Sequence, residues 1–287
     1  MSHFYNEWEK YPAQWLRNLG AAGEIPEGHV EEKSITELLP EDLDGFVQAH
    51  FFAGIGGWPL ALRLAGWPKD RPVWTGSPPC QPFSSAGLKK GMEDERHLAP
   101  QWINLVRQCR PPTIFGEQVA DAIGKGWLDA LFSELEQEGY ACGAAVLPAV
   151  SVGAPHLRHR LFFVADSRGE RVWRNAGRAL VEEDTLRNFT KHFFIDDDLE
   201  DVQGPNAGSP TSDFWSGCRW VPATDRKFRP AESSTCVVDH GFPSRMGRTR
   251  AYGNAIVPQV AAKFITAFLQ SECEAERVLG QGALADL

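Results

Sequence analysis

Short apolar runs alternate with amphipathic segments between residues 48 and 165. The first run leads from Gln48 into the glycine-rich sequence FAGIGG at 52–57, and the leucine-rich residues that follow favour a helix. Further apolar runs predict strands at 72–79, 112–115, 140–149 and 161–165, and amphipathic segments predict helices at 100–108 and 127–138. Glu117 lies just past the carboxyl end of one of these strands. The alternation predicts an α/β fold, a sheet with helices on both faces.

The periodic pattern weakens after residue 165. Residues 196–201 form an acidic run, and GPNAGSPTS at 204–212 has the composition of a loop. An apolar helical pattern returns around 260–268, and we expect the residues from 271 onward to fray. We therefore predict a main domain of residues 1–165 plus 246–287 and a small irregular lobe of residues 166–245.

Composition narrows the class of protein. Of the 287 residues 43% are hydrophobic, with ten Trp and seventeen Phe, which excludes a disordered chain. The net charge of −9 excludes a uniformly basic nucleic-acid binder, so any such contact must come from a local patch. No apolar run approaches the ~20 residues that span a bilayer, and the N-terminal MSHFYNEWEK is polar. We expect a soluble cytoplasmic protein with no membrane contact.

Six cysteines are spread along the chain, with no C-x-x-C pair and no cluster with histidine at zinc spacing. We therefore expect no metal, and a chain of this size without a secretion signal is expected to keep its thiols reduced. One cysteine has an unusual setting. PPCQPFS at 78–84 holds Cys80 between two prolines in a rigid loop after a strand, which makes its thiol a candidate nucleophile. The alternative is a buried, inert cysteine.

The FAGIGG turn at 52–57 would lie at the carboxyl end of a strand and at the start of a helix. Open α/β sheets bind nucleotide-like cofactors at this place, because glycines let the backbone approach a ligand. Taken alone, such a turn could serve packing only.

Five motifs together resemble the DNA cytosine-5 methyltransferases. FAGIGG is similar to their cofactor motif, PPCQPFS to their nucleophile loop and GEQV at 116–119 to their Glu-Asn-Val motif. APHLRHRLFFVA at 154–165 is similar to their Gln-x-Arg-x-Arg motif, and GNAIVPQVA at 253–261 to their C-terminal motif. The resemblance implies a Rossmann-like S-adenosylmethionine-dependent methyltransferase sheet, with residues 166–245 as the target-recognition lobe.

One departure from the family concerns the segment that grips the cofactor. In the family, two strands separate the glycine turn from the nucleophile, whereas Gly57 and Cys80 leave room for one helix and one strand. The N-terminal residues 3–45 resemble the missing segment: a short strand, Asn6-Glu7-Trp8, an amphipathic helix and a second strand. We infer a permuted motif order, in which the strand around Phe4 would lie beside the strand around Phe51.

The resemblance implies a set of residues that bind S-adenosylmethionine. Glu7 would bond the ribose hydroxyls, Trp8 and Phe52 would stack on the adenine, and Asn254 would help to close the pocket. The alternatives are a surface charge for Glu7, core packing for Trp8 and Phe52, and a turn-forming role for Asn254. The full set is Glu7, Trp8, Ser34, Ile35, Phe52, Ala53, Gly54, Ile55, Gly56, Gly57, Pro78, Asn254 and Ala255.

The resemblance also implies a mechanism. The Cys80 thiolate would attack carbon 6 of a flipped cytosine, and Glu117 would hydrogen-bond ring N3 and the amino group. Arg158 and Arg160 would hold the flipped nucleotide and brace the catalytic loop, with surface salt bridging as the alternative. The family's Asn is Gln118 here, from which we expect a modulated loop-positioning hydrogen bond.

Two stretches have a local positive charge that suits phosphate contacts. Residues 155–178 carry six arginines against two acids, and residues 219–250 carry seven Lys or Arg against three acids. The alternative is that these charges belong to solvated loops that contact no phosphate. The residues expected to contact double-stranded DNA are Gln81, Ser84, Ser85, Arg245 and Arg248.

Three hypotheses remain open from the sequence. The first is a DNA cytosine-5 methyltransferase that acts as a monomer on duplex DNA. The second is a catalytically lapsed DNA-binding relative, against which the intact Cys80, Glu117, Arg158 and Arg160 argue. The third is a cytosine-5 enzyme that acts on tRNA or uses a modified donor. The separate lobe favours duplex DNA.

Overall fold

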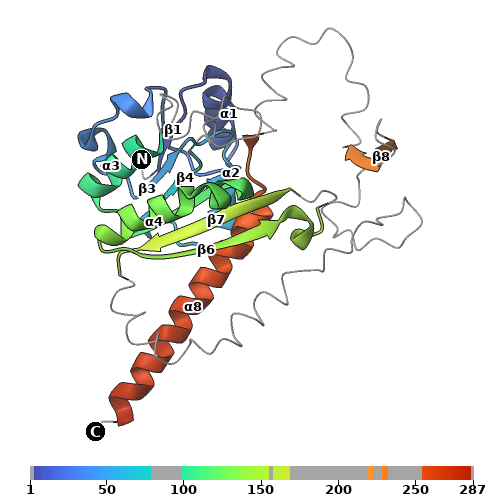
Figure 1. Cartoon of the computed structure of the whole chain (residues 1–287). Helices are drawn as coiled ribbons and strands as arrows, with labels where there is room; N and C mark the ends of the chain where they lie inside the picture. Colours follow the sequence, from blue (N-terminus) through green and yellow to red (C-terminus); the bar gives the residue numbers. More distant parts are fainter. Residues whose placement is uncertain are drawn as a thin grey trace.

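A computed structural model describes residues 3–78, 98–154, 158–168, 219–222, 228–231 and 254–285 (Figure 1). Only the backbone is described for the two segments between 219 and 231 and for the helix beyond residue 273.

The centre of the fold is a seven-stranded sheet of order β2-β1-β3-β4-β5-β7-β6. Strands β2, β1, β3, β4 and β5 run parallel, and β7 is antiparallel to both of its neighbours. We call the side of the sheet where the parallel strands end its carboxyl edge, and the opposite side its amino edge. The strands are β1 (His3–Asn6), β2 (His29–Glu31), β3 (Gln48–Phe51), β4 (Val73–Gly76), β5 (Thr113–Val119), β6 (Ala141–Pro148) and β7 (His159–Asp166).

Helices cover both faces of this sheet, as the alternating pattern predicts. One face packs on α3 and α4, around Trp102 and Leu131. The other packs on α2 and α8, around Trp58 and Ile265, and on α1 through Leu16. The helices are α1 (Lys10–Ala21), α2 (Gly57–Leu64), α3 (Ala99–Cys109), α4 (Trp127–Gln137) and α8 (Pro258–Ala285).

Neighbouring strand residues divide between the two cores. Ile114 and Phe163 belong to the cluster under α3 and α4, whereas Phe115 and Phe162 belong to the cluster under α2 and α8. Side chains of a strand alternate between the faces of a sheet, so a strand buried on both faces must be apolar at successive positions. The nearly continuous apolar run of β7 is explained in this way.

The N-terminal strand lies inside the sheet, between β2 and β3. Phe4 is in register with Ala49 of β3, and Asn6 with Phe51. The Asn6 side chain donates to the carbonyl of Lys33 at 2.8 Å, and its own carbonyl accepts from the amide of Ala53 at 3.0 Å. The strand around Phe4 therefore lies beside the strand around Phe51, which is the adjacency that the sequence argument requires.

Two boundaries differ from the sequence-based expectations. Glu117 lies inside β5 rather than past its end: β4 pairs only as far as Gly116, but β7 pairs with β5 as far as Val119. The antiparallel partner thus extends the strand. The expected fraying from residue 271 is also wrong, because α8 continues to Ala285. Residues 271–285 contain three Glu, three Ala and two Leu, which are good helix formers, against two glycines.

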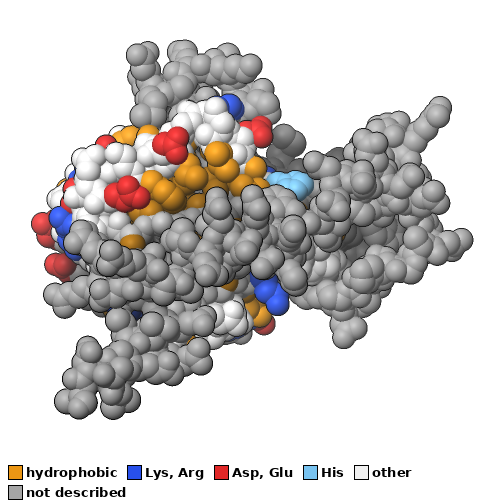
Figure 2. Space-filling model, turned by 60° about the horizontal axis from the view of Figure 1, so that its bottom comes forward, with side chains coloured by type: hydrophobic (Ala, Val, Ile, Leu, Met, Phe, Trp, Pro, Cys, Tyr) orange, Lys and Arg blue, Asp and Glu red, His pale blue; other side chains and the backbone are white. Residues whose placement is uncertain are grey.

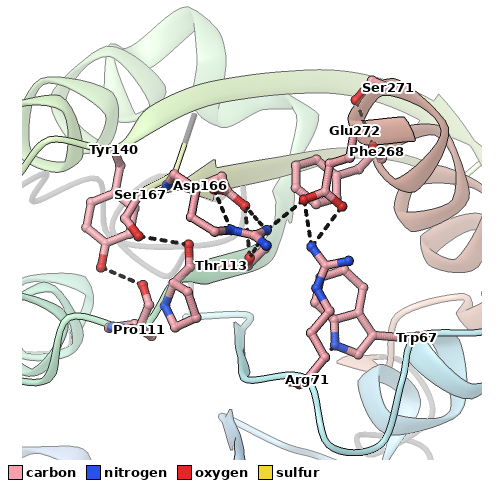
Figure 3. Close-up of polar contacts among 12 residues, drawn as sticks. Trp67, Arg71, Pro111, Thr113, Tyr140, Asp166, Ser167, Phe268, Ser271 and Glu272 are labelled. Atoms are coloured by element: carbon pink, nitrogen blue, oxygen red, sulfur yellow. Dashed lines mark hydrogen bonds and ion pairs between the residues drawn. The ribbon is translucent and has the colours of Figure 1, made fainter. Parts of the chain in front are cut away.

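A polar network at the amino edge ties the end of β7 to α8 (Figure 3). The Arg168 guanidinium donates to Asp166 at 2.7 Å and to Glu272 of α8 at 2.6 Å. Glu272 also accepts from Arg71, and Thr113 at the start of β5 donates to Asp166 at 2.9 Å. The chain therefore leaves the sheet at a point that is fixed to two strands and a helix.

The strand β6 forms one edge of the sheet and carries no charged residue. Most of its side chains are partly exposed, and that of Ala144 is exposed. The face turned forward in Figure 2 shows a strip of hydrophobic side chains with acidic ones beside it. Because charges on an edge strand oppose pairing with another chain, β6 itself lacks this protection.

A separate two-stranded antiparallel sheet, β8 (Arg219–Pro222) with β9 (Phe228–Ala231), falls in the predicted lobe. Among the described residues, no helix has both the length and the apolar character to cross a membrane.

A buried histidine makes the core sensitive to acid. His50 of β3 is fully buried between Tyr5 of β1 and Thr75 of β4, and its Nδ1 lies 2.8 Å from the Thr75 hydroxyl. Its Nε2 has no hydrogen-bond partner among the described residues. Burial lowers the pKa of His50 to about 3, so the folded protein keeps this imidazole neutral.

We expect the contribution of His50 to the free energy of unfolding, taken as the difference between wild type and a variant without this imidazole, to fall as the pH drops below the pKa of a free histidine. Below that pKa, His50 binds a proton in the unfolded chain but stays neutral in the folded protein. Its contribution to the free energy of unfolding is therefore retained at pH 7 and is smaller by about 2 kcal/mol at pH 5. His50→Leu should remove most of this loss, whereas His29→Gln on the surface should not. Urea unfolding at the two pH values measures the difference; an unchanged loss in His50→Leu would contradict the assignment.

Candidate active site

The glycine turn between β3 and α2 lies at the carboxyl edge of the sheet. Gly54 and Gly56 have φ of +55° and +83°, a backbone region that favours glycine, and Phe52 enters it with φ of +52°. Helix α2 then begins at Gly57, and its amino end points toward the carboxyl edge. The turn thus offers backbone with few side chains beside a helix amino terminus, which suits an approaching ligand.

Glu7 connects the end of β1 to this turn. Its Oε2 accepts from the amide of Gly54 at 2.8 Å, and its Oε1 accepts from the amide of Glu9 at 2.9 Å. The residue is only 8% exposed. Glu7 is therefore not a surface charge, and its carboxylate lies against the predicted cofactor motif. Each carboxylate oxygen can accept a further hydrogen bond.

Trp8, the next residue, is 66% exposed. The alternative that it anchors the core is therefore wrong. Tryptophan is usually well buried, so an exposed indole beside a buried acid and a glycine turn suits a stacking surface.

The other predicted cofactor residues have mixed settings. Phe52 is half-buried and packs against the cluster under α3 and α4. Ser34 accepts from the amide of Thr36 at 3.4 Å and so caps a short 3-10 turn, and Ile35 is buried in the core. Ala53 is buried, and Ile55 is partly exposed.

Glu117 and Arg160 form an ion pair across β5 and β7, in which the acid is buried and the arginine is partly exposed. Arg160 Nε lies 2.8 Å from Glu117 Oε1, and Glu117 is 7% exposed. Burial raises the pKa of Glu117 to about 7, although Arg160 and Arg158 oppose the rise. A carboxyl group of this pKa can both hold and release a proton near neutral pH.

Gln118 fastens the start of the loop that contains Cys80. Its side-chain amide donates to the carbonyl of Pro78 at 3.1 Å, and its Oε1 accepts from the amide of Val119 at 2.9 Å. Trp58 of α2 adds a hydrogen bond from its indole to the Ser77 hydroxyl at 2.9 Å. Pro78 is thus held from β5 while the preceding residue is held from α2.

Arg158 turns to a different partner from Arg160. Its Nη2 donates to the carbonyl of Ala255 at 2.8 Å. Burial and the neighbouring Arg160 lower the pKa of Arg158, and Glu117 partly offsets the change. The two arginines of the motif therefore reach two different parts of the site.

The C-terminal motif lies against the glycine turn. Asn254 is exposed and Ala255 partly exposed, whereas Ile256 is buried. A Cβ at Gly57 would lie 2.6 Å from Ile256 Cγ1, so only glycine fits there. The packing of Ile256 on Gly57, which requires glycine there, was not predicted from the sequence. The hydrophobic residue directly after Gly-Asn-Ala could have indicated such a contact.

The sequence also did not identify the aromatic layer under the site. A side chain at Gly76 would collide with Trp102 of α3, and one at Gly116 with Phe163 of β7. These glycines pair with each other where β4 ends and where β5 loses its parallel neighbour. Glycine at the ends of adjacent strands was the available signal for close packing.

The structure brings together part of the predicted site. Glu7, Gly54, Gly57, Asn254 and Ala255 are placed around the glycine turn, and Pro78, Glu117 and Arg160 lie at the ends of β4, β5 and β7. Six predicted residues lie outside the described residues: Cys80, Gln81, Ser84, Ser85, Arg245 and Arg248. Within the described ranges, no group of three or more His, Cys, Asp or Glu side chains could hold a metal ion.

Several curated proteins are similar to parts of this chain. The type II methyltransferase M.AplI of Arthrospira platensis is 38% identical over 95 residues, which cover 32% of this chain and 28% of that protein. M.AquIA of Picosynechococcus is 35% identical over 33% of this chain and 43% of its own length. M.NgoMIV of Neisseria gonorrhoeae is 28% identical over 67% of this chain and 68% of its own length. The chain thus matches less than half of the first two relatives.

Among solved structures, a DNMT2 mutant from Spodoptera frugiperda is 17% identical with a TM-score of 0.40, covering 57% of this chain and 41% of that one. The Entamoeba histolytica methyltransferase EhMeth is 16% identical with a TM-score of 0.41, covering 57% and 44%.

The sequence model of one family matches residues 67–213, which is half of the chain. The matched range begins just after α2 and includes Cys80, Glu117 and Arg160. The chain therefore belongs to the C-5 cytosine-specific DNA methylase family.

Proposed function

We propose that this protein is a DNA cytosine-5 methyltransferase, which transfers a methyl group from S-adenosylmethionine to carbon 5 of a flipped cytosine. The observation that carries the proposal is the ion pair of the buried Glu117 with Arg160, next to Gln118, whose side chain is hydrogen-bonded to Pro78, two residues before Cys80 in the sequence. A surface salt bridge would be exposed, whereas this acid is 7% exposed and has a pKa of about 7. Family membership supplies the chemical context.

The residues at the glycine turn fit S-adenosylmethionine. Glu7 is positioned to add a ribose contact to the hydrogen bond that it makes with Gly54, and the exposed Trp8 offers a face for the adenine. The cofactor would supply an activated methyl group. The position of β1 between β2 and β3 supports the proposal that residues 3–45 supply the segment that the family has after its glycine turn.

Glu117 would donate a hydrogen bond to the cytosine ring and offset the charge that develops on it. In its protonated form the carboxyl group donates to ring N3 of cytosine, which offsets the negative charge that develops when the Cys80 thiolate attacks carbon 6. Arg160 holds the carboxyl group in place through the 2.8 Å contact. Carbon 5 would then accept the methyl group, and loss of its proton to a base such as water would let the Cys80 sulfur leave by elimination, which restores the aromatic ring.

Recognition of double-stranded DNA would fall to the lobe of residues 166–245 and to the loop after Cys80, with Gln81, Ser84, Ser85, Arg245 and Arg248 as the proposed contacts. The two positively charged stretches, 155–178 and 219–250, support phosphate binding at both ends of this lobe. A lapsed, DNA-binding relative is less well supported. Burying an acid costs stability, and buried acids with a raised pKa are found mainly at functional sites.

The central test is formation of 5-methylcytosine. Purified protein incubated with labelled S-adenosylmethionine and mixed-sequence DNA should yield this nucleoside, and Cys80→Ser should lower the rate by at least about 10³-fold, because a hydroxyl is a far weaker nucleophile. Cys109→Ser, at the far end of α3, should retain activity. Equal rates for wild type and Cys80→Ser would contradict the mechanism, and tRNA as the only methylated polymer would contradict the proposed substrate.

The pH dependence tests the role of Glu117. Because its pKa is about 7, the protonated fraction falls as the pH rises, so single-turnover methylation should decline above about pH 7. Glu117→Gln should be slower by about 10²- to 10⁴-fold and should lose this decline, since an amide does not titrate. If the rate of Glu117→Gln still declines above pH 7, the decline comes from the titration of another group and the role of Glu117 is wrong.

Cofactor binding tests the N-terminal segment. Trp8→Ala should weaken the binding of S-adenosylhomocysteine by about tenfold, the contribution of one stacked aromatic, while Trp8→Phe should retain most of it. Glu7→Gln should also weaken binding, whereas Glu9→Gln serves as the neighbouring carboxylate control. Isothermal titration calorimetry measures these affinities, and unchanged values in Trp8→Ala would remove the support for residues 3–45 as the cofactor segment.

A further inference from the structure

Arg158 lies just before β7, at the carboxyl edge of the sheet, and is half-buried. Its guanidinium donates to the carbonyl of Ala255 at 2.8 Å. Ala255 is 97 residues further along the chain, so this hydrogen bond joins two distant segments. A charged donor to a backbone carbonyl fixes the main chain itself, whatever side chain is present there.

The segment that Arg158 fixes lies directly before α8. In this segment Ile256 is 8% exposed and packs into the space above Gly57, where even a Cβ would come within 2.6 Å. Ile256 shares its cluster with Trp58 of α2 and with Val260 and Ile265 of α8. The position of residues 254–257 is therefore coupled by close packing to the first residue of α2 and to the glycine turn.

The nearby Arg160 contacts a different part of the site from Arg158. Arg160 contacts Glu117, on the side of the site that would receive the cytosine. Arg158 instead donates its hydrogen bond to the main chain next to the glycine turn, although its charge also lowers the pKa of Glu117. Arg160 in β7 and Arg158 just before it therefore contact two different parts of the site.

We propose that Arg158 is a positioning residue that sets the affinity for the cofactor, by holding residues 254–257 against the glycine turn. This inference rests on the proposed function only in taking the glycine turn as the cofactor site. It gives Arg158 a role that needs no contact with the flipped nucleotide. Without the guanidinium, the Ala255 carbonyl loses its donor and Ile256 is held on Gly57 by packing alone.

The test compares Arg158→Gln with the matched variant Arg160→Gln in the full chain. Calorimetry with S-adenosylhomocysteine and no DNA should show binding weakened about tenfold in Arg158→Gln, the loss expected for one charged hydrogen bond. Arg160→Gln should change this affinity by less than about twofold, since its partner lies on the base side. In turnover, Arg158→Gln should mainly raise KM for the donor and Arg160→Gln should mainly lower kcat. Arg158→Lys should restore part of the affinity.

Hydrogen exchange supplies a measurement that needs no ligand. A peptide covering residues 254–262 should exchange faster in Arg158→Gln than in wild type, because the first-turn bonds from Val260 and Ala261 to Val257 depend on the position of this segment. Peptides from β5 and α3 should be unchanged, which excludes general unfolding.

The outcomes separate this inference from the proposed function. If Arg158→Gln binds S-adenosylhomocysteine as the wild type does, or shows the kinetic profile of Arg160→Gln, the inference is wrong and the methyltransferase proposal stands. If wild type binds the cofactor product but forms no 5-methylcytosine, the proposed reaction is wrong while the affinity comparison still decides the role of Arg158. A wild type that binds no S-adenosylhomocysteine contradicts both.

Discussion

The antiparallel pairing of β5 with β7 is the constraint on which the site depends. The pairing runs from Thr113 opposite Asp166 to Val119 opposite Arg160, three residues beyond the last residue that β4 pairs. This extra length carries Glu117 and Gln118 past the parallel part of the sheet while both remain hydrogen-bonded in a strand. Their side chains therefore have fixed directions, one toward Arg160 and the other toward Pro78. A loop after β5 would not hold a buried acid so firmly.

Much of the fold was predictable because the strands are buried on both faces. Continuous apolar runs such as LFFVA in β7 have no polar period, and the alternation of such runs with amphipathic segments leaves few arrangements other than a two-sided sheet. The end of β5 was missed for the opposite reason. Glu117 and Gln118 are polar, so periodicity ends the strand before them, and only the partner strand shows that it continues.

The site was predictable where a motif fixes its own backbone, and less so where it depends on distant contacts. The FAGIGG turn and Glu7 were identified from local sequence, and the structure joins them by one hydrogen bond. The contact of Arg158 with Ala255 could not be predicted, because it joins segments separated by the whole irregular stretch. The packing of Ile256 on Gly57 is likewise a tertiary constraint with no local pattern.

The direction of β7 decides how the stretch between residues 168 and 254 is attached. The chain leaves the sheet at the amino edge, where Arg168 is bound to Glu272, and returns at the carboxyl edge, where Ala255 is bound to Arg158. Helix α8 runs between these two points, and the 14 steps from Pro258 to Glu272 span about 21 Å at 1.5 Å per residue. The helix therefore acts as a strut that sets the spacing between the two attachment points. Any segment that joins these two attachment points must match this spacing, so the positions of its two ends limit which segments could replace residues 169–253.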